Sequence, residues 1–261
     1  MIIDTHCHLN DDAFEDREDI IANLKNNNIK SAFVVGTDLQ TSIFAIELAK
    51  KHSNLFAIVG MYPEYCQQYD KKFEQFLIEN ATNPKVVAIG EIGLDYHTDG
   101  FDKEKQKEIL LRQLEIAHKF NLPLSIHVRD AFEDLLNIFE SHKDLLSSGG
   151  VIHCFSGSPE IAQRFVKLGF KLGFGGVCTF KNARKVVDTL KQIDESQILL
   201  ETDAPYLAPE PFRGKRNEPK FTNIVLDKIC EIRGQDRNYL EQKILQNTKE
   251  VFKKYRDWNG T

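Results

Sequence analysis

The chain opens with MIIDTHCHLN (residues 1–10), a short apolar run that ends in a His-x-His pair, His6 and His8. The run is apolar on both faces, which is typical of a strand buried in a parallel sheet. An open doubly wound sheet usually carries a glycine-rich turn after its first strand, and here that turn is His-Cys-His. The opening stretch therefore favours a parallel sheet of another kind.

Short apolar, β-branched runs recur along the chain, and longer charged segments with helical periodicity separate them. The eight runs cover residues 1–5, 31–36, 56–60, 86–90, 124–127, 151–154, 170–174 and 198–202. Amphipathic helices are predicted over residues 102–120, 130–142 and 159–168, and two more over the tail, 222–258. Asp102 and Ser158-Pro159 are suited to begin two of these helices.

Eight βα repeats in 261 residues predict a (β/α)8 TIM barrel of the α/β class. A barrel of this length needs one domain, so residues 1–261 are expected to form a single unit. An open doubly wound sheet, which usually has fewer strands, is the alternative.

Composition limits the environment and the partners of the chain. Hydrophobic residues make up 41% of it, enough for a sizeable core, and no apolar run approaches membrane-spanning length. The N-terminus has no basic region followed by an apolar run, and the five cysteines show no C-x-x-C spacing. We therefore expect a cytoplasmic, monomeric protein that does not bind membranes. A net charge of −5 argues against a broad nucleic-acid-coating surface, but allows a small phosphate site made positive by a metal ion.

Ionisable side chains stand at the ends of five of the eight runs. They are His6 and His8 after the first run, Glu91 after the fourth, His127 in the fifth, His153 in the sixth and Asp203 after the eighth. Catalytic groups of a barrel gather at the C-terminal ends of its strands, so these six residues are expected at one mouth. Residues i and i+2 of a strand point the same way, so His6 and His8 can offer two nitrogens to one cation.

Each of these residues taken alone has a purely structural explanation. His127 alone is more typical of a hydrogen-bonded barrel residue, Glu91 of an acceptor for backbone amides, and Asp203 of a helix cap. Together these explanations fail, because the barrel end would then bury several ionisable groups without partners. Six ligands exceed one tetrahedral site and suit two ions about 3.5–4 Å apart, bridged by a carboxylate and a hydroxide.

Cys7 and Cys154 lie next to histidines of this set, which raises the question of thiolate ligands. Strand alternation turns both side chains away from the mouth, so we expect them to pack in the interior. Histidine and carboxylate ligands favour zinc, manganese, iron or cobalt over calcium.

These motifs together resemble the TatD family of metal-dependent deoxyribonucleases, which belongs to the amidohydrolase superfamily. The resemblance runs in order from the first predicted strand to the loop after the last, and covers nearly the whole chain. The motifs are Asp4-Thr5-His6-Cys7-His8-Leu9, Gly90-Glu91-Ile92-Gly93-Leu94-Asp95-Tyr96, Ile126-His127-Val128-Arg129-Asp130, His153-Cys154-Phe155-Ser156-Gly157-Ser158, Leu200-Glu201-Thr202-Asp203-Ala204-Pro205-Tyr206-Leu207 and Arg213-Gly214-Lys215-Arg216-Asn217-Glu218-Pro219.

The resemblance implies a site for two divalent metal ions, with Zn, Mg, Mn and Co as candidates. His6, His8 and Asp203 would hold one ion, His127 and His153 the other, and Glu91 would bridge them. Asp203 would also take the proton from the attacking water as a general base.

One position departs from the family pattern and directs attention to substrate contacts. Many members carry Gly-x-His-Pro at the end of the third strand, where this chain has Gly60-Met61-Tyr62-Pro63. A phenol, with a reference pKa of about 10, is a poor neutral metal ligand, but it can donate to a phosphate oxygen.

The candidate substrate contacts are Tyr62, Arg129, Arg213 and Arg216. Four aromatic residues near strand ends, Tyr62, Tyr65, Tyr96 and Phe155, are candidates for stacking on an unpaired base.

The resemblance implies hydrolysis of phosphodiester bonds, most directly as a 3′–5′ exonuclease that acts on the 3′ end of single-stranded DNA. The alternative on the same metal site is a D-aminoacyl-tRNA deacylase or another ester or amide hydrolase. A metal-stabilised binding protein without catalytic activity is a further alternative, but in such a protein nothing would keep acids at Glu91 and Asp203. A cofactor-dependent oxidoreductase is disfavoured because the chain lacks the glycine-rich turn that binds a nucleotide.

Overall fold

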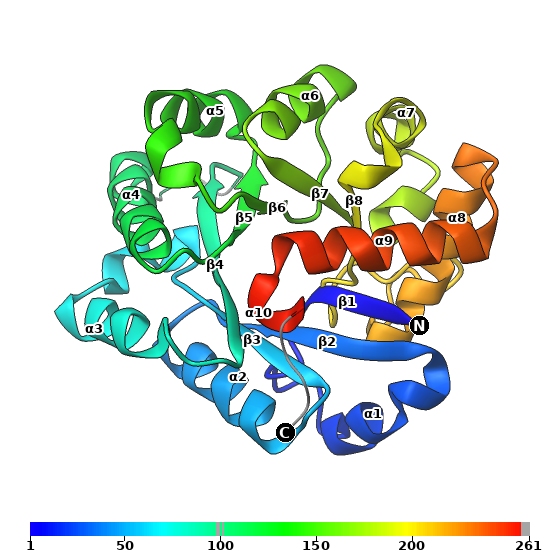
Figure 1. Cartoon of the computed structure of the whole chain (residues 1–261), viewed down its shortest axis with the longest axis horizontal. Helices are drawn as coiled ribbons and strands as arrows, with labels where there is room; N and C mark the ends of the chain where they lie inside the picture. The colour runs from blue at the N-terminus through cyan, green and yellow to red at the C-terminus, as the bar shows by residue number, and fades with distance from the viewer. Residues whose placement is uncertain (98–99, 101, 257–261) are drawn as a thin grey trace.

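The computed structural model describes residues 1–97, 100 and 102–256. Eight parallel strands pair in chain order from β1 to β8, and Cys7 at the end of β1 bridges Ala204 beyond β8. The strands are β1 (Ile2–Cys7), β2 (Ile29–Val35), β3 (Leu55–Val59), β4 (Val86–Asp95), β5 (Leu124–Arg129), β6 (Gly150–Ile152), β7 (Phe170–Phe174) and β8 (Ile198–Leu200). Helices surround these strands (Figure 1), so the predicted (β/α)8 barrel is confirmed.

The helices alternate with the strands. They are α1 (Arg17–Asn23), α2 (Leu39–Lys51), α3 (Lys71–Asn80), α4 (Lys103–Lys119), α5 (Phe132–Ser141), α6 (Pro159–Lys167), α7 (Arg184–Gln192), α8 (Thr222–Arg233), α9 (Arg237–Val251) and α10 (Lys253–Arg256). The short 3-10 helix η2 (Pro63–Gln68) follows β3. None of the helices in the described part of the chain combines the length and the apolarity needed to cross a bilayer.

The predicted helix starts are confirmed. The Asp102 side chain accepts from the Lys105 amide at the start of α4, and Ser158 accepts from the Ile161 amide ahead of Pro159 in α6. The tail holds three helices rather than the predicted two, because α10 follows α9 directly. The end of the predicted tail helix, at residue 258, lies outside the described residues.

Strand β4 is longer than its predicted run and carries Glu91 inside the sheet. Residues 92–95 continue to pair with β5, with Gly93 opposite His127. Gly93 has φ +150°, and a Cβ there would lie 1.8 Å from the His127 carbonyl oxygen. The tight approach of β4 to β5 therefore requires glycine at this position, and it fixes the backbone beside His127.

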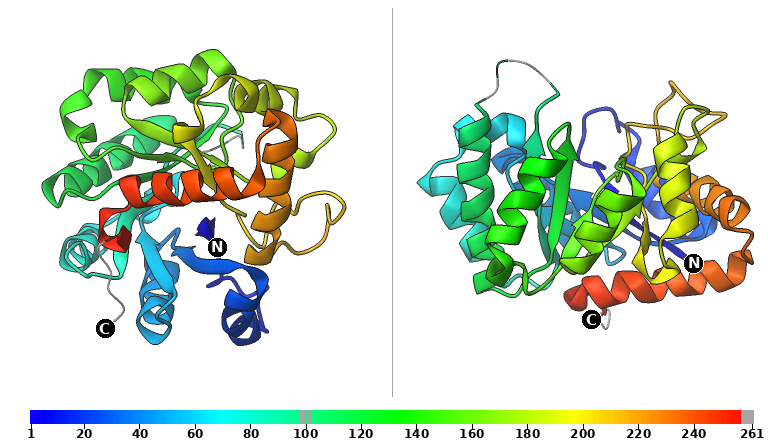
Figure 2. Two further views of the ribbon diagram at one scale, coloured as in Figure 1. Left: turned by 45° about the vertical axis from the view of Figure 1, so that its right-hand side comes forward. Right: turned by 90° about the horizontal axis from the view of Figure 1, so that it is seen from above.

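The barrel is filled at one end by an apolar layer. Phe33 and Phe56 from the strands pack edge-on against each other, and Phe33 packs in the same way against Phe252 beyond α9 and Tyr255 of α10. Figure 2 shows α9 lying across this end of the barrel, while the long loops lie at the other end. The N-terminal ends of the strands are thus covered, and the polar strand ends lie at the opposite mouth.

Candidate metal centre

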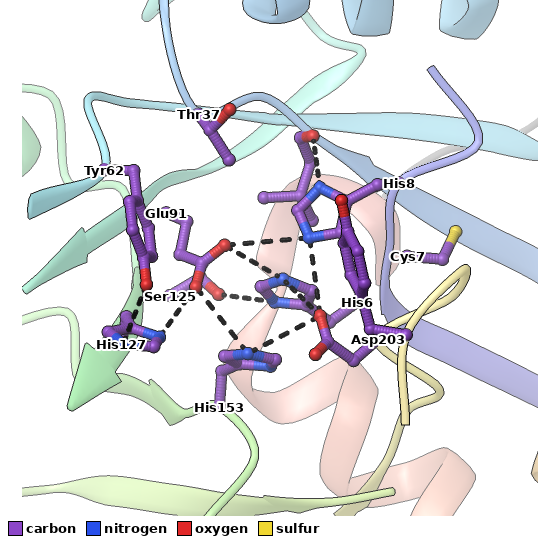
Figure 3. A network of polar contacts seen from close by, with 12 residues as sticks. His6, Cys7, His8, Thr37, Tyr62, Glu91, Ser125, His127, His153 and Asp203 are labelled. Atoms are coloured by element: carbon purple, nitrogen blue, oxygen red, sulfur yellow. Dashed lines mark hydrogen bonds and ion pairs between the residues drawn. The ribbon is translucent and has the colours of Figure 1, made fainter. Parts of the chain in front are cut away.

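The structure brings all six predicted ligand residues together at the C-terminal ends of the strands (Figure 3). Glu91 lies in the middle, and its two oxygens face different pairs of histidines. Oε2 lies 3.4 Å from His6 Nε2 and 3.7 Å from His8 Nε2. Oε1 lies 3.0 Å from His127 Nδ1 and 3.6 Å from His153 Nε2. The carboxylate of Glu91 is therefore placed to bridge two groups of donors.

Asp203 completes the group that contains His6 and His8. Its Oδ1 lies 3.4 Å from His8 Nε2 and 3.8 Å from both His6 Nε2 and His153 Nε2. The residue follows β8 with φ 61°, a left-handed conformation that is uncommon for a non-glycine residue, and its amide donates to the His6 carbonyl at 2.9 Å. Backbone strain of this kind is often found where a side chain must be aimed at a site.

Each of the four imidazoles presents one nitrogen to the cluster and holds the other against a partner outside it. The outer contacts are His6 Nδ1 to Ser125 Oγ at 3.4 Å, His8 Nδ1 to the Val35 carbonyl at 3.1 Å, His127 Nε2 to Asp95 Oδ2 at 2.8 Å, and His153 Nδ1 to Glu201 Oε1 at 3.0 Å. Such outer partners orient metal-bound histidines and fix which ring nitrogen is free to bind.

The arrangement fits two divalent ions. Among the described residues, the buried His6 Nε2 has no hydrogen-bond partner, although it points into the cluster. Donor atoms of His6, His8 and Asp203 lie within 4.8 Å of one another, as do those of Glu91, His127 and His153. A third combination, His6, His153 and Glu201, takes one histidine from each group. Nitrogen and carboxylate donors of this kind suit zinc, manganese, iron or cobalt.

Electrostatics favour charged carboxylates in the cluster. Burial works against ionisation of Glu91, but the imidazoles of His6 and His127 outweigh it and hold the pKa of that carboxyl well below its usual range. Burial lowers the pKa of His153, but Glu201 and Asp203 outweigh it and raise that pKa to about 10. Without ions, the carboxylates are therefore balanced by protonated imidazole, and ion binding must displace protons.

Two acids next to the cluster were missed in the sequence. Asp95, the last residue of β4, is 1% exposed, and Glu201, directly after β8, is fully buried. Glu201 also accepts from the Cys154 amide at 2.5 Å. Both are acidic residues at a strand end within the quoted motifs, so the signal that found Glu91 and Asp203 applies to them as well.

A cavity of about 720 Å³ lies over the cluster. Two predicted substrate contacts, Tyr62 and Arg129, line it. The other two are engaged elsewhere: Arg216 makes a bidentate ion pair with Asp16 at 2.7 and 2.8 Å, and the Arg213 guanidinium lies 4.3 Å from the centre of the Phe180 ring. The structure therefore does not bring Arg213 and Arg216 to the cavity.

The predicted stacking residues also divide into two groups. Tyr62 and Tyr65 line the cavity, together with Tyr206, which is not among the predicted stacking residues. Phe155 is instead 2% exposed and packs against Phe132 and Phe165. Tyr96 donates to Asp134 at 2.9 Å, outside the cavity lining.

The two cysteines beside the histidines behave differently. Cys7 is fully buried and its thiol faces the Phe33 carbonyl at 3.4 Å, so the prediction of interior packing is confirmed for it. For Cys154 the prediction is wrong, because the residue is only partly buried and is part of the cavity lining. Strand β6 ends at Ile152 and Cys154 has φ 45°, so strand alternation no longer sets the direction of its side chain.

Known proteins share this fold and sequence. Residues 3–253 match a family model described as TatD related DNase. The metal-dependent hydrolase YabD of Bacillus subtilis, itself uncharacterized, is 38% identical, over 97% of this chain and 99% of that protein. The 3′-5′ ssDNA/RNA exonuclease TatD of Escherichia coli is 35% identical, over 91% of this chain and 93% of that protein.

A solved structure agrees with the sequence relatives. The crystal structure of YjjV, a TatD homologue from Escherichia coli, superposes with a TM-score of 0.92 at 32% identity, covering 97% of this chain and 98% of that one. A barrel of this topology, a cluster of metal-binding side chains at its mouth and these relatives lead to one conclusion. The chain belongs to the TatD family of metal-dependent hydrolases.

Proposed function

We propose that this hydrolase is a nuclease that removes nucleotides from the 3′ end of single-stranded DNA. The observation that carries the proposal is the position of Glu91, between two donor groups at the base of a cavity whose wall holds Arg129. The TatD relative named as a 3′-5′ exonuclease supports the same reaction.

Two ions held by these residues would activate a water molecule near neutral pH and stabilise negative charge on a phosphate oxygen. Asp203 lines the cavity, and although burial opposes ionisation, His153 and His8 keep the pKa of its carboxyl below the usual range. It is therefore a carboxylate that can accept the proton of the attacking water. The water oxygen bonds to phosphorus and the bond from phosphorus to the 3′ oxygen breaks. The last nucleoside leaves as its 5′-phosphate, and the 3′ oxygen of the shortened strand takes up a proton to become a hydroxyl.

The charge of the cavity fits a single phosphate held close to the ions. Apart from the histidines of the cluster, Arg129 is the one cationic side chain among the described lining residues, whereas Asp11 and Asp38 line the same cavity. A polyanion therefore gains little from the wall beyond Arg129, and the charge of the ions must hold the scissile phosphate. This favours attack at a chain end over binding along an extended strand.

The rim of the cavity offers surfaces for unpaired bases. Tyr65, Tyr206 and Leu207 line it and are 39%, 53% and 40% exposed. Exposed tyrosine rings beside a phosphate site can stack on bases of any sequence, and stacking requires a strand that is not paired. These residues support single-stranded over double-stranded substrate.

A second candidate is the ester bond of a D-aminoacyl-tRNA. Asp11 lines the cavity and is only partly buried, so its carboxylate, which accepts from the Tyr206 hydroxyl at 3.1 Å, is placed to pair with the ammonium group of an aminoacyl ester. The scissile bond would then be a carboxylic ester instead of a phosphodiester, cleaved on the same cluster.

The deciding experiment compares the two substrates in one assay. Protein loaded with Mn or Zn is given a 3′-labelled single-stranded oligodeoxynucleotide and, separately, a D-aminoacyl-tRNA. Stepwise release of labelled nucleotide with the ester left intact supports the nuclease, and Asp11→Asn should leave that release unchanged. Rapid deacylation with an intact oligonucleotide, slowed by Asp11→Asn, would replace the first candidate with the second.

A further inference from the structure

Tyr62 lines the cavity at the position where many family members carry a histidine, and its hydroxyl group is hydrogen-bonded beside the cluster. It lies between β3 and η2, directly before Pro63, and its amide donates to the Thr37 carbonyl at 2.8 Å. The hydroxyl donates to Asp95 Oδ2 at 2.8 Å. It also lies 3.2 Å from His127 Nε2 (Figure 3). The phenol therefore engages the outer side of a predicted metal ligand.

Asp95 is held from several sides. Its Oδ1 accepts from the His97 amide at 2.9 Å, while Oδ2 receives Tyr62 and lies 2.8 Å from His127 Nε2. Its backbone amide and carbonyl both bond to the Gln106 side chain at 2.9 Å. A carboxylate held in this way has Oδ1 bonded to the His97 amide. Its Oδ2 can therefore accept both the Tyr62 hydroxyl and the proton of His127 Nε2.

The hydrogen bond from Nε2 of His127 to Asp95 determines the state of Nδ1, the other nitrogen of that ring. When Nε2 carries a proton directed at Asp95, Nδ1 has its lone pair free, and Nδ1 is the atom that lies 3.0 Å from Glu91 Oε1. The Tyr62 ring also packs edge-on against the His127 ring at 4.8 Å.

We propose that Tyr62 and Asp95 are positioning residues that fix His127 with its Nδ1 aimed at the second metal ion, and that Tyr62 does not bind substrate phosphate. The inference rests on the metal centre of the proposed function. It predicts an effect on one ion only, because the contacts reach His127 and leave His6, His8 and Asp203 untouched. At the position of the family histidine, the tyrosine thus orients one member of the second donor group.

The test is a calorimetric titration of metal-stripped protein with Mn or Zn. The variants are Tyr62→Phe, which removes only the hydroxyl, and Asp95→Asn, which keeps the shape but presents a group that cannot take the Nε2 proton in the same way. The matched control is Tyr69→Phe, because the Tyr69 hydroxyl also donates to a carboxylate, Glu74 at 3.2 Å, outside the cavity lining. Thermal melts establish that each variant is folded.

The wild-type protein and Tyr69→Phe should bind two ions. Tyr62→Phe and Asp95→Asn should bind one of the two about 10–100-fold more weakly, as for other partners of metal-bound histidines. With a saturating ion, Tyr62→Phe should regain most of its kcat, and KM for the oligonucleotide should stay near the wild-type value.

Two results would overturn the inference, and only the second would also overturn the proposed metal centre. Unchanged affinity for both ions in Tyr62→Phe, with a raised KM, would return Tyr62 to a substrate contact and leave the metal centre standing. Failure of the wild-type protein to bind any ion would remove the metal centre and the positioning role together.

Discussion

The Glu201 carboxylate lies 3.0 Å from His153 Nδ1, while Nε2 of the same ring faces Glu91 at 3.6 Å. Glu201 thus forms an ion pair with the outer nitrogen of His153, where Asp95 forms a hydrogen bond with that of His127, so a buried acid lies next to both histidines of the second donor group. Glu201 fits because residue 173 is glycine: a Cβ at Gly173 would lie 2.1 Å from Glu201 Oε2.

Substitution of Gly173 should therefore weaken the binding of the second ion, although it changes none of the six predicted ligand residues. We expect Gly173→Ala to displace the Glu201 side chain, and to lower the affinity for one ion by about 10–100-fold, as Glu201→Gln should. Metal titration checks both. Gly175→Ala is the control, because the nearest atom to a Cβ there is 3.4 Å away. Equal losses in Gly173→Ala and Gly175→Ala would show a general effect of crowding on the strand.

Arg129 and Arg216 should have separable roles. Loss of a charge-assisted hydrogen bond to phosphate costs about 1.5–3 kcal/mol, so Arg129→Ala should raise KM for an oligonucleotide by about tenfold or more. Arg216→Ala breaks the ion pair with Asp16 and should lower the free energy of unfolding by up to about 1 kcal/mol, with KM unchanged. Kinetics and urea unfolding of both variants test this, and a raised KM in Arg216→Ala would bring that residue back to the substrate.

Removal of the ions should destabilise the protein. Ions that bind only the folded chain stabilise it by about 2.7 kcal/mol at a concentration one hundred times Kd. We expect the Tm to rise when Mn or Zn is added to stripped protein. In His6→Ala, which lacks a donor of the first group, the rise should be smaller. Differential scanning calorimetry measures both, and a Tm that does not respond to any ion would contradict the site.

Lys85 at the closed end of the barrel should add a pH-dependent term to stability. Its Nζ donates to the carbonyls of His52, Ser53 and Leu55, and burial lowers its pKa from 10.5 to about 8. Between these two values the unfolded chain holds more protons than the folded chain, so this contribution to stability rises with pH. Urea unfolding at pH 7, 8, 9 and 10 should show the wild-type protein gaining on Lys85→Met as pH rises. A constant difference would show that Lys85 titrates alike in both states.

Much of the fold was predictable because each strand is apolar on both faces and each polar ligand stands at a strand end. The same pattern found the six residues from His6 to Asp203, since parallel strands carry their C-terminal ends to one mouth. It could not place Arg216, whose position depends on Asp16, about 200 residues away in the chain. It also failed at Cys154, where a left-handed backbone follows a three-residue strand, so strand alternation no longer predicts how the side chain lies.

Tyr62 shows why a motif alone does not give a role. The sequence indicates only that a phenol replaces an imidazole, and a phenol can donate to phosphate or to carboxylate alike. In the structure the hydroxyl donates to the carboxylate of Asp95, the last residue of β4. Contacts of this kind join side chains from different strands, and the spacing of residues within one strand does not reveal them.

The central claim is a two-ion centre that hydrolyses a phosphodiester bond. The most direct measurement is release of nucleotide from a 3′-labelled single-stranded oligodeoxynucleotide while metal-stripped protein is titrated with Mn. We predict no release without the ion, a rise that saturates at about two equivalents per chain, and no release by Asp203→Asn at any ion concentration. Saturation at one equivalent, or an intact oligonucleotide in protein shown to hold two ions, would contradict the account.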